Sequence, residues 1–218
     1  MNAINAALKS LYTSKWAALE RITQNDGVSW PLLLNVPPEY GQARRRHLVV
    51  VQQTDEWGGY GDDADRVAWL MEGYAHFALA RSYKSTPFWQ ASRELYASLN
   101  PDGPPFGFLW SNLVKVDQQG DRPVEHVEEA VCELGLLPAE VDIVRPEAVV
   151  FFTGHSYDPR LRSTFPALRL VQLGEFLVRL EHPVLPFHTY RTPHPKWLRL
   201  KKHWNILERA AQEMGTHA

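Results

Sequence analysis

Runs of residues typical of buried strands alternate along this chain with segments of helical periodicity, and no other feature restricts its fold as strongly. The run at residues 46–52 contains HLVVV, which is continuous and β-branched and therefore suits a parallel strand covered on both faces. Strand signals return at residues 106–116 and 148–153, with weaker ones at 169–173 and 184–189. The alternation predicts an α/β fold in which helices cover both faces of a largely parallel sheet.

Helices are expected where apolar residues recur three and four positions apart. No repeat, low-complexity tract or linker-like stretch divides the sequence, so we expect a single domain over residues 1–218 with its core at about 46–200. The predicted helices cover about residues 3–23, 65–83, 88–99 and 124–137, a short segment starting at Pro138, and about 196–214.

Composition and charge leave the class of partner open. The single cysteine, Cys132, cannot form an internal disulfide, which fits a reducing compartment. The N-terminus is amphipathic rather than signal-like, and no apolar run approaches the roughly 20 residues that span a bilayer. We therefore expect a cytoplasmic protein without membrane contact, most simply a monomer. The formal net charge of −2 does not exclude nucleic acid, because a local basic face is enough to bind phosphates.

Three loops are expected at the carboxyl ends of the strands, where ligands gather in parallel α/β sheets. They cover residues 52–63, 112–122 and 154–158. The first carries Q-Q-T-D-E-W-G-G directly after a buried strand, so its polar groups can be held rigidly while its glycines allow close approach to a ligand. A glycine-rich turn that caps the following helix would explain the same pattern.

Two polar residues outside that loop also indicate binding. Asn112 interrupts an apolar strand, and its amide offers the donors and the acceptor that a nucleobase edge requires; a core asparagine bonded to backbone is the alternative. His194 lies between prolines just before the final helix and beside Lys196 and Arg199. An anion could bind there, although a lone histidine is more often structural.

In order, spacing and strand context, these segments resemble the uracil-DNA glycosylase superfamily. Residues 52–57 (QQTDEW) are similar to a first motif such as G-Q-D-P-Y-H and especially to a G-Q-E-T-N-G-W variant. Residues 111–115 (SNLVK) are similar to a later T-N-V-V-K phrase, and residues 194–196 (HPK) to a final H-P-S-type loop. The resemblance spans about residues 46–200. It implies a three-layer α/β/α fold around a central, mostly parallel four-stranded sheet.

The activity that this resemblance implies is excision of uracil or another deaminated base from DNA, by base flipping and hydrolysis of the N-glycosidic bond, without a metal or cofactor. Asn112 would bind the flipped base, with Gln52 beside it and Trp57 or Phe106 stacked on it, although both aromatic residues are also ordinary core residues. His194 would stabilise the negative charge that develops on a base oxygen as the bond breaks.

The resemblance also assigns the remaining site residues. Asp55, or less favourably Glu56, would orient water or stabilise the cationic sugar, and Gln53 occupies the position of the family's water-activating acid. Basic residues at the start of the final helix would hold DNA phosphates without reading sequence, although such a face is also ordinary solvated surface. These residues are Lys196, Arg199 and Lys202.

Several positions depart from the family pattern. Val51 replaces the usual leading glycine, Gln53 replaces the acid, and Thr54 replaces the proline that follows. Lys196 stands where a small serine is common, which adds charge to the final loop. These departures bear on catalysis more than on the fold.

Three alternatives to a glycosylase stay open. A non-catalytic relative would keep the pocket and bind nucleic acid or a nucleotide without cleaving it, which Gln53 favours. A structural partner in a larger assembly would use the many aromatic residues. A metal-dependent hydrolase would use acidic residues around one helix start together with a glutamate and histidine four positions apart. The residues of this metal hypothesis are Asp62, Asp63, Asp65, Glu72 and His76.

Overall fold

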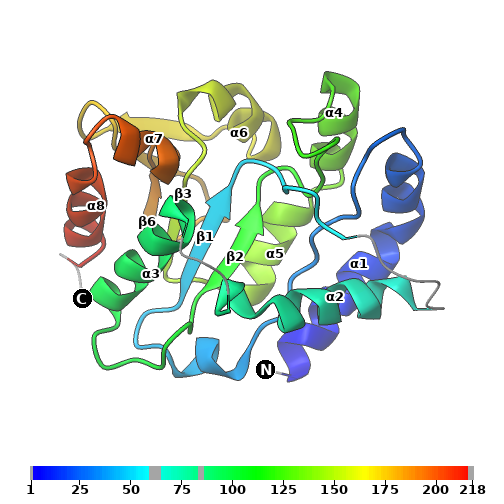
Figure 1. Cartoon of the computed structure of the whole chain (residues 1–218), viewed down its shortest axis with the longest axis horizontal. Helices are drawn as coiled ribbons and strands as arrows, with labels where there is room; N and C mark the ends of the chain where they lie inside the picture. Colours follow the sequence, from blue (N-terminus) through cyan, green and yellow to red (C-terminus); the bar gives the residue numbers. More distant parts are fainter. Residues whose placement is uncertain (1, 59–64, 83–85, 216–218) are drawn as a thin grey trace.

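The computed structural model describes residues 2–58, 65–82 and 86–215, and these residues form an α/β fold with a six-stranded mixed sheet (Figure 1). The strand order is β2-β1-β3-β6-β5-β4. The first four of these strands are parallel neighbours, and β5 and β4 continue the sheet as antiparallel strands. The strands are β1 His47–Val51, β2 Leu109–Asn112, β3 Ala148–Phe151, β4 Arg169–Gln172, β5 Val178–Glu181 and β6 His188–Arg191.

The prediction of an α/β fold is confirmed, whereas the expected count of four strands is wrong. The two additional strands are β4 and β5, which form an antiparallel hairpin. In β5, Val178 and Leu180 are buried while Arg179 and Glu181 are half-buried, which is the alternation of a strand with one covered face. The count of four was implied by the resemblance; among the five runs with strand signals, residues 169–173 match β4 and no run matches β5. The last run, residues 184–189, begins too early because residues 182–185 form a turn.

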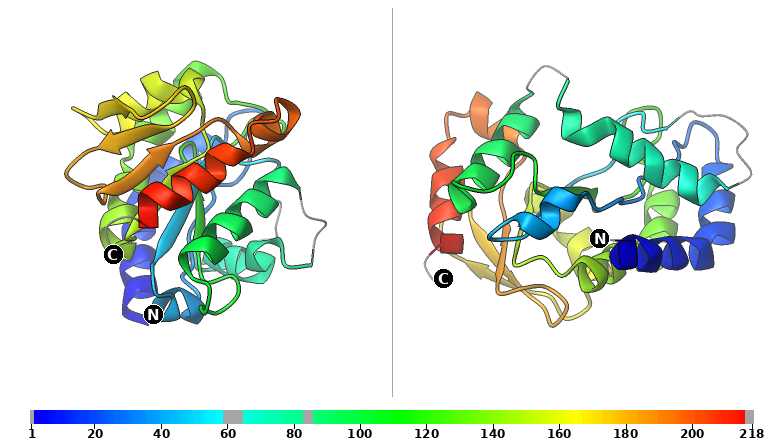
Figure 2. Two further views of the ribbon diagram at one scale, coloured as in Figure 1. Left: turned by 90° about the vertical axis from the view of Figure 1, so that its left-hand side faces the viewer. Right: turned by 90° about the horizontal axis from the view of Figure 1, so that it is seen from below.

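Helices lie on both sides of the sheet. Figure 2 shows α1 and α5 on one side and α2 and α3 on the other. Helix α1 packs against α5 and α4, and α3 packs against α7 and α8. The α-helices are α1 Asn2–Thr23, α2 Arg66–Phe77, α3 Pro87–Leu99, α4 Glu125–Glu133, α5 Leu136–Val144, α6 Asp158–Thr164, α7 Pro195–Leu200 and α8 Asn205–Gly215.

The last helix predicted from the sequence is two helices in the structure. Helix α7 ends in a turn in which the His203 N–H donates to the Leu198 carbonyl and the Lys202 N–H to the Arg199 carbonyl. Lys202 has a φ of 60°, so the pattern is that of a helix ended by one left-handed residue. The apolar spacing of three and four continues across this turn, which is why the sequence pattern does not reveal it.

Other boundaries differ for similar reasons. Gly135, with a φ of 66°, separates α4 from α5. Helix α2 ends at Phe77 because residues 78–80 are all left-handed. Strand β2 begins only at Leu109, and Phe106 before it has a φ of 61° rather than the expected strand conformation. Helix α6 was not predicted. Among the described residues, no helix is both long enough and apolar enough to cross a membrane.

Acid is expected to destabilise this fold through His47, which is fully buried at the start of β1. Loss of hydration lowers the pKa of His47 from 6.5 to about 3. The unfolded chain therefore binds this proton first, so stability is complete above about pH 6.5 and is lost as pH falls toward about 3. Between pH 7.5 and 5.0 we expect His47 alone to lower the free energy of unfolding by about 2 kcal/mol, measured by urea unfolding. In His47→Leu this part of the pH dependence should vanish, and an unchanged dependence would contradict the prediction.

Candidate functional site

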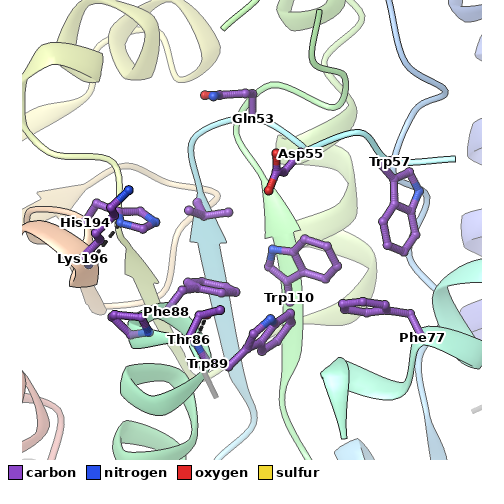
Figure 3. Close-up of a pocket in the computed structure, with 12 residues that line it drawn as sticks. Gln53, Asp55, Trp57, Phe77, Thr86, Phe88, Trp89, Trp110, His194 and Lys196 are labelled. Carbon is purple, nitrogen blue, oxygen red and sulfur yellow. Dashed lines mark hydrogen bonds between the residues drawn. The ribbon is translucent and has the colours of Figure 1, made fainter. Parts of the chain in front are cut away.

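A pocket of about 630 Å³ opens at the carboxyl ends of the parallel strands (Figure 3). Its walls come from β2, the end of β1 and the loop after it, the end of α2, the start of α3, and the start of α7 with the residue before it. This is the edge of a parallel sheet where ligands bind in such folds. The lining residues are Val51, Gln53, Asp55, Trp57, Phe77, Thr86, Pro87, Phe88, Trp89, Trp110, His194 and Lys196.

Aromatic rings make up most of the apolar wall. Trp110 of β2 lies at their centre, with ring centroids 5.3 Å from Trp89, 5.4 Å from Trp57 and Phe77, and 6.3 Å from Phe88. Of these residues, the sequence had pointed only to Trp57. The other four occupy apolar positions of helices or a strand. Residues of the core and residues of a pocket both occupy such positions, so the sequence pattern does not distinguish them. The wall suits a flat, largely apolar ligand.

Asn112 lies beneath this wall. It pairs in register with Val51 and follows Trp110 by two residues on β2, so its side chain is on the sheet face that carries the pocket. The residue is fully buried, and neither its amide oxygen nor its amide nitrogen has a hydrogen-bond partner among the described residues. It is therefore not the backbone-bonded core asparagine of the alternative interpretation. Both amide atoms are shielded from solvent, and Asn112 is not among the residues that line the pocket.

His194 is held as a neutral donor at the edge of the pocket. Its Nδ1 accepts the Lys196 backbone N–H at 3.2 Å, and its ring stacks on Phe88 with centroids 6.2 Å apart. Burial, and then the charge of Lys196, lower the pKa of His194 to about 4. With Nδ1 accepting, the proton of the neutral ring is on Nε2. Figure 3 shows the ring pointing into the pocket.

The loop after β1 brings a carboxylate to the pocket. Figure 3 shows the Asp55 side chain directed into the pocket above Trp110, while Gln53 lies along the rim. The buried Asp117 shapes this loop, because it accepts the Thr54 hydroxyl at 2.6 Å and the Trp57 N–H at 3.3 Å. Thr54, which stands where the resembling motif has a proline, thus has a structural role. Asp117 was not among the predicted site residues.

Several residues with predicted roles lie outside the pocket. The Gln52 amide donates to the Thr153 carbonyl at 2.9 Å and so joins the ends of β1 and β3. Phe106 packs instead beneath two guanidinium groups, those of Arg81 at 4.7 Å and Arg93 at 5.2 Å from its ring centroid. Neither Gln52 nor Phe106 lines the pocket.

Of the three basic residues expected at phosphates, Lys196 is the one that lines the pocket. Arg199 is exposed and stacks over Trp204 at 4.4 Å from the ring centroid. Lys202 is exposed in the turn that ends α7. These two side chains remain available to a partner that extends beyond the pocket.

The metal hypothesis finds no support in the described residues. Asp62 and Asp63 lie outside them. Asp65 caps α2 through the Ala68 N–H and pairs with Lys9 at 2.7 Å, and the predicted pair Glu72 and His76 is exposed, as in an ordinary solvated helix face. Within the described ranges, no three acidic, histidine or cysteine side chains are grouped as metal ligands would be.

Sequence comparison finds no match among protein-family models and none among curated proteins. The fold and the site together define an α/β protein with an aromatic pocket at the carboxyl ends of its parallel strands. The functional argument therefore rests on the pocket.

Proposed function

We propose that the chain is a DNA glycosylase, similar to the uracil-DNA glycosylase superfamily in its motifs, that excises uracil or another deaminated base. A monomer acting on cytoplasmic DNA, with the three-layer glycosylase fold, belongs to the same proposal. The main support for this proposal is the Asn112 amide. It is a buried donor and acceptor without hydrogen-bond partners among the described residues, and it lies on the sheet face beneath an aromatic pocket. An unsatisfied buried amide costs about 1–3 kcal/mol, which a ligand with a complementary edge recovers.

The aromatic wall complements this amide. A flipped base is read along its hydrogen-bonding edge and stacked between flat side chains, because it has left the base stack of the helix. Trp57 and Phe88, together with Trp110, supply such surfaces.

Bond cleavage can be assigned to His194 and Asp55. The bond between the sugar C1′ and the base nitrogen breaks with its electron pair moving to the base, and His194 Nε2–H would donate to the base oxygen that gains charge. The Asp55 carboxylate would stabilise the cationic sugar and orient the water whose oxygen bonds to C1′. One proton of that water ends on the released base, and the other stays on the new sugar hydroxyl.

The first test is excision from single- and double-stranded oligonucleotides that contain uracil, hypoxanthine or xanthine. We expect His194→Ala to lower the rate about 100- to 1,000-fold, the usual effect of removing a donor from a developing anion. Because the pKa of His194 is about 4, the rate should not fall as pH is lowered from 8 to 6, where an ordinary histidine titrates. The rate is measured as abasic product against pH.

Two further variants make this test specific. Asp55→Asn should also lose activity, whereas His76→Ala, which changes an exposed histidine outside the pocket, should retain it. A rate that falls near pH 6.5 in the parent but not in His194→Ala would contradict a neutral His194. Parental activity in both His194→Ala and Asp55→Asn would remove the proposed site.

A non-catalytic base-binding relative is the second candidate, and one contact favours it. Gln53, at the family's acid position, carries an amide that cannot take a proton from water as a carboxylate does, and its oxygen already accepts the Tyr157 hydroxyl at 2.7 Å. This candidate predicts salt-dependent binding of DNA with no abasic product at high protein concentration.

A further inference from the structure

Hydrogen bonds and one ring contact connect a buried carboxylate of α4 to the rim of the pocket. Glu128 is 2% exposed and pairs with Arg122 at 2.9 Å and Arg160 at 3.3 Å. The Arg122 guanidinium lies over the Tyr157 ring, 4.3 Å from its centroid. Tyr157, itself buried just before α6, donates its hydroxyl to Oε1 of Gln53. Only Gln53 of these five residues lines the pocket.

The Tyr157 hydroxyl determines which end of the Gln53 amide meets a ligand. Burial raises the pKa of Tyr157 to about 12, so the phenol keeps its proton at physiological pH. Arg122 covers one face of the ring and thereby restrains it. Since Oε1 accepts the hydrogen bond from the Tyr157 hydroxyl, the amide NH₂ of Gln53 is left for other partners, and it makes no hydrogen bond within the described parts of the chain.

We propose that Tyr157 is a positioning residue that presents Gln53 as a hydrogen-bond donor to the substrate. Together with the Lys196 ammonium, which lines the same pocket, the Gln53 NH₂ group would hold an acceptor oxygen of the sugar–phosphate part of the nucleotide whose base enters the pocket. The inference rests on the proposed base-binding function. It gives Gln53 a role in binding rather than in water activation, because an outward NH₂ group cannot accept a proton from water.

The test is a double-mutant cycle read by binding. Pentadeoxynucleotides with a central uracil, hypoxanthine or xanthine are titrated while the tryptophan fluorescence of the pocket is followed. We expect Tyr157→Phe to raise Kd about five- to tenfold and Gln53→Ala to raise it by a similar factor. The double variant should bind no more weakly than Gln53→Ala alone, because the hydroxyl acts through the amide.

Tyr96→Phe is the matched control. It removes a tyrosine hydroxyl that donates to the Pro104 carbonyl at 2.8 Å, away from the pocket, so it should bind like the parent. If catalysis is present, Tyr157→Phe should raise KM by the same factor as Kd and leave kcat within about twofold, a split that general loss of structure would not produce. Thermal unfolding confirms that each variant is folded.

Each outcome decides between the alternatives. Factors that multiply in the double variant, or an unchanged Kd for folded Tyr157→Phe, would overturn the positioning role while leaving base binding intact. If Gln53→Ala weakens binding of the 5′-monophosphate but not of the nucleoside, the acceptor is a phosphate oxygen; equal weakening assigns it to the sugar. If the parent binds none of the three oligonucleotides, base binding itself is wrong, and the role of Tyr157 falls with it.

Discussion

Asn112→Leu is expected to weaken base binding strongly and, at the same time, to stabilise the fold. The substitution removes the amide that reads the base, so binding and excision should fall about 100-fold, near the upper end for a bidentate base contact. It also removes two buried polar atoms that lack partners among the described residues, and leucine has a similar branched shape. The free energy of unfolding should therefore rise by about 1–2 kcal/mol, measured by urea unfolding.

Asn100→Leu is the matched control, because it replaces a buried asparagine whose amide does have hydrogen-bond partners. Asn100 is also buried, but its amide accepts the Arg45 N–H at 2.7 Å and donates to the Arg45 and Tyr96 carbonyls. Its replacement leaves backbone groups unpaired and should lower stability by about 1–3 kcal/mol without changing base binding. A destabilised Asn112→Leu would mean that the Asn112 amide is held for structural reasons, and the main support for a base site would be lost.

The sequence predicted the elements whose pattern is set by burial alone. The run HLVVV became β1 because all five of its residues are covered on both faces, and the amphipathic first segment became α1. The sequence did not predict where a single residue in the left-handed conformation ends a helix or changes the direction of the chain. Lys202, Phe106 and Ala78 take left-handed conformations without being glycine, so no residue type marks the ends that they create.

The same distinction applies to the candidate site. Asp55 was predicted because it lies in the loop directly after a buried strand, and His194 because it stands between prolines at a helix start beside Lys196 and Arg199; the structure brings both to the pocket. Phe88 and Trp89 were missed because they begin a helix whose apolar positions also face the core. Phe106 could not be excluded in advance, since its position depends on the left-handed turn before β2.

Ser111 and Lys115, which flank Asn112 in the resembling motif, belong to the opposite side of the sheet. Lys115 is buried and pairs with Glu140, whose carboxylate also accepts the Tyr12 hydroxyl at 2.7 Å and the Ser111 hydroxyl at 3.2 Å. Burial lowers the pKa of Lys115 below its ordinary value, and the charge of Glu140 opposes that shift. The motif therefore combines a residue facing the pocket with an ion pair in the core.

Lys115→Met is expected to lower the free energy of unfolding by about 3–5 kcal/mol, because it leaves the Glu140 carboxylate buried without its cation. Adding Glu140→Gln should restore most of this loss, since the double variant buries no charge and the new amide can still accept the Tyr12 hydroxyl. Urea unfolding of the two single variants and the double variant measures the coupling. For the exposed pair Lys9 and Asp65, the same design should give less than about 1 kcal/mol. Additive losses at Lys115 and Glu140 would show that the two charges are stabilised separately, and not by each other.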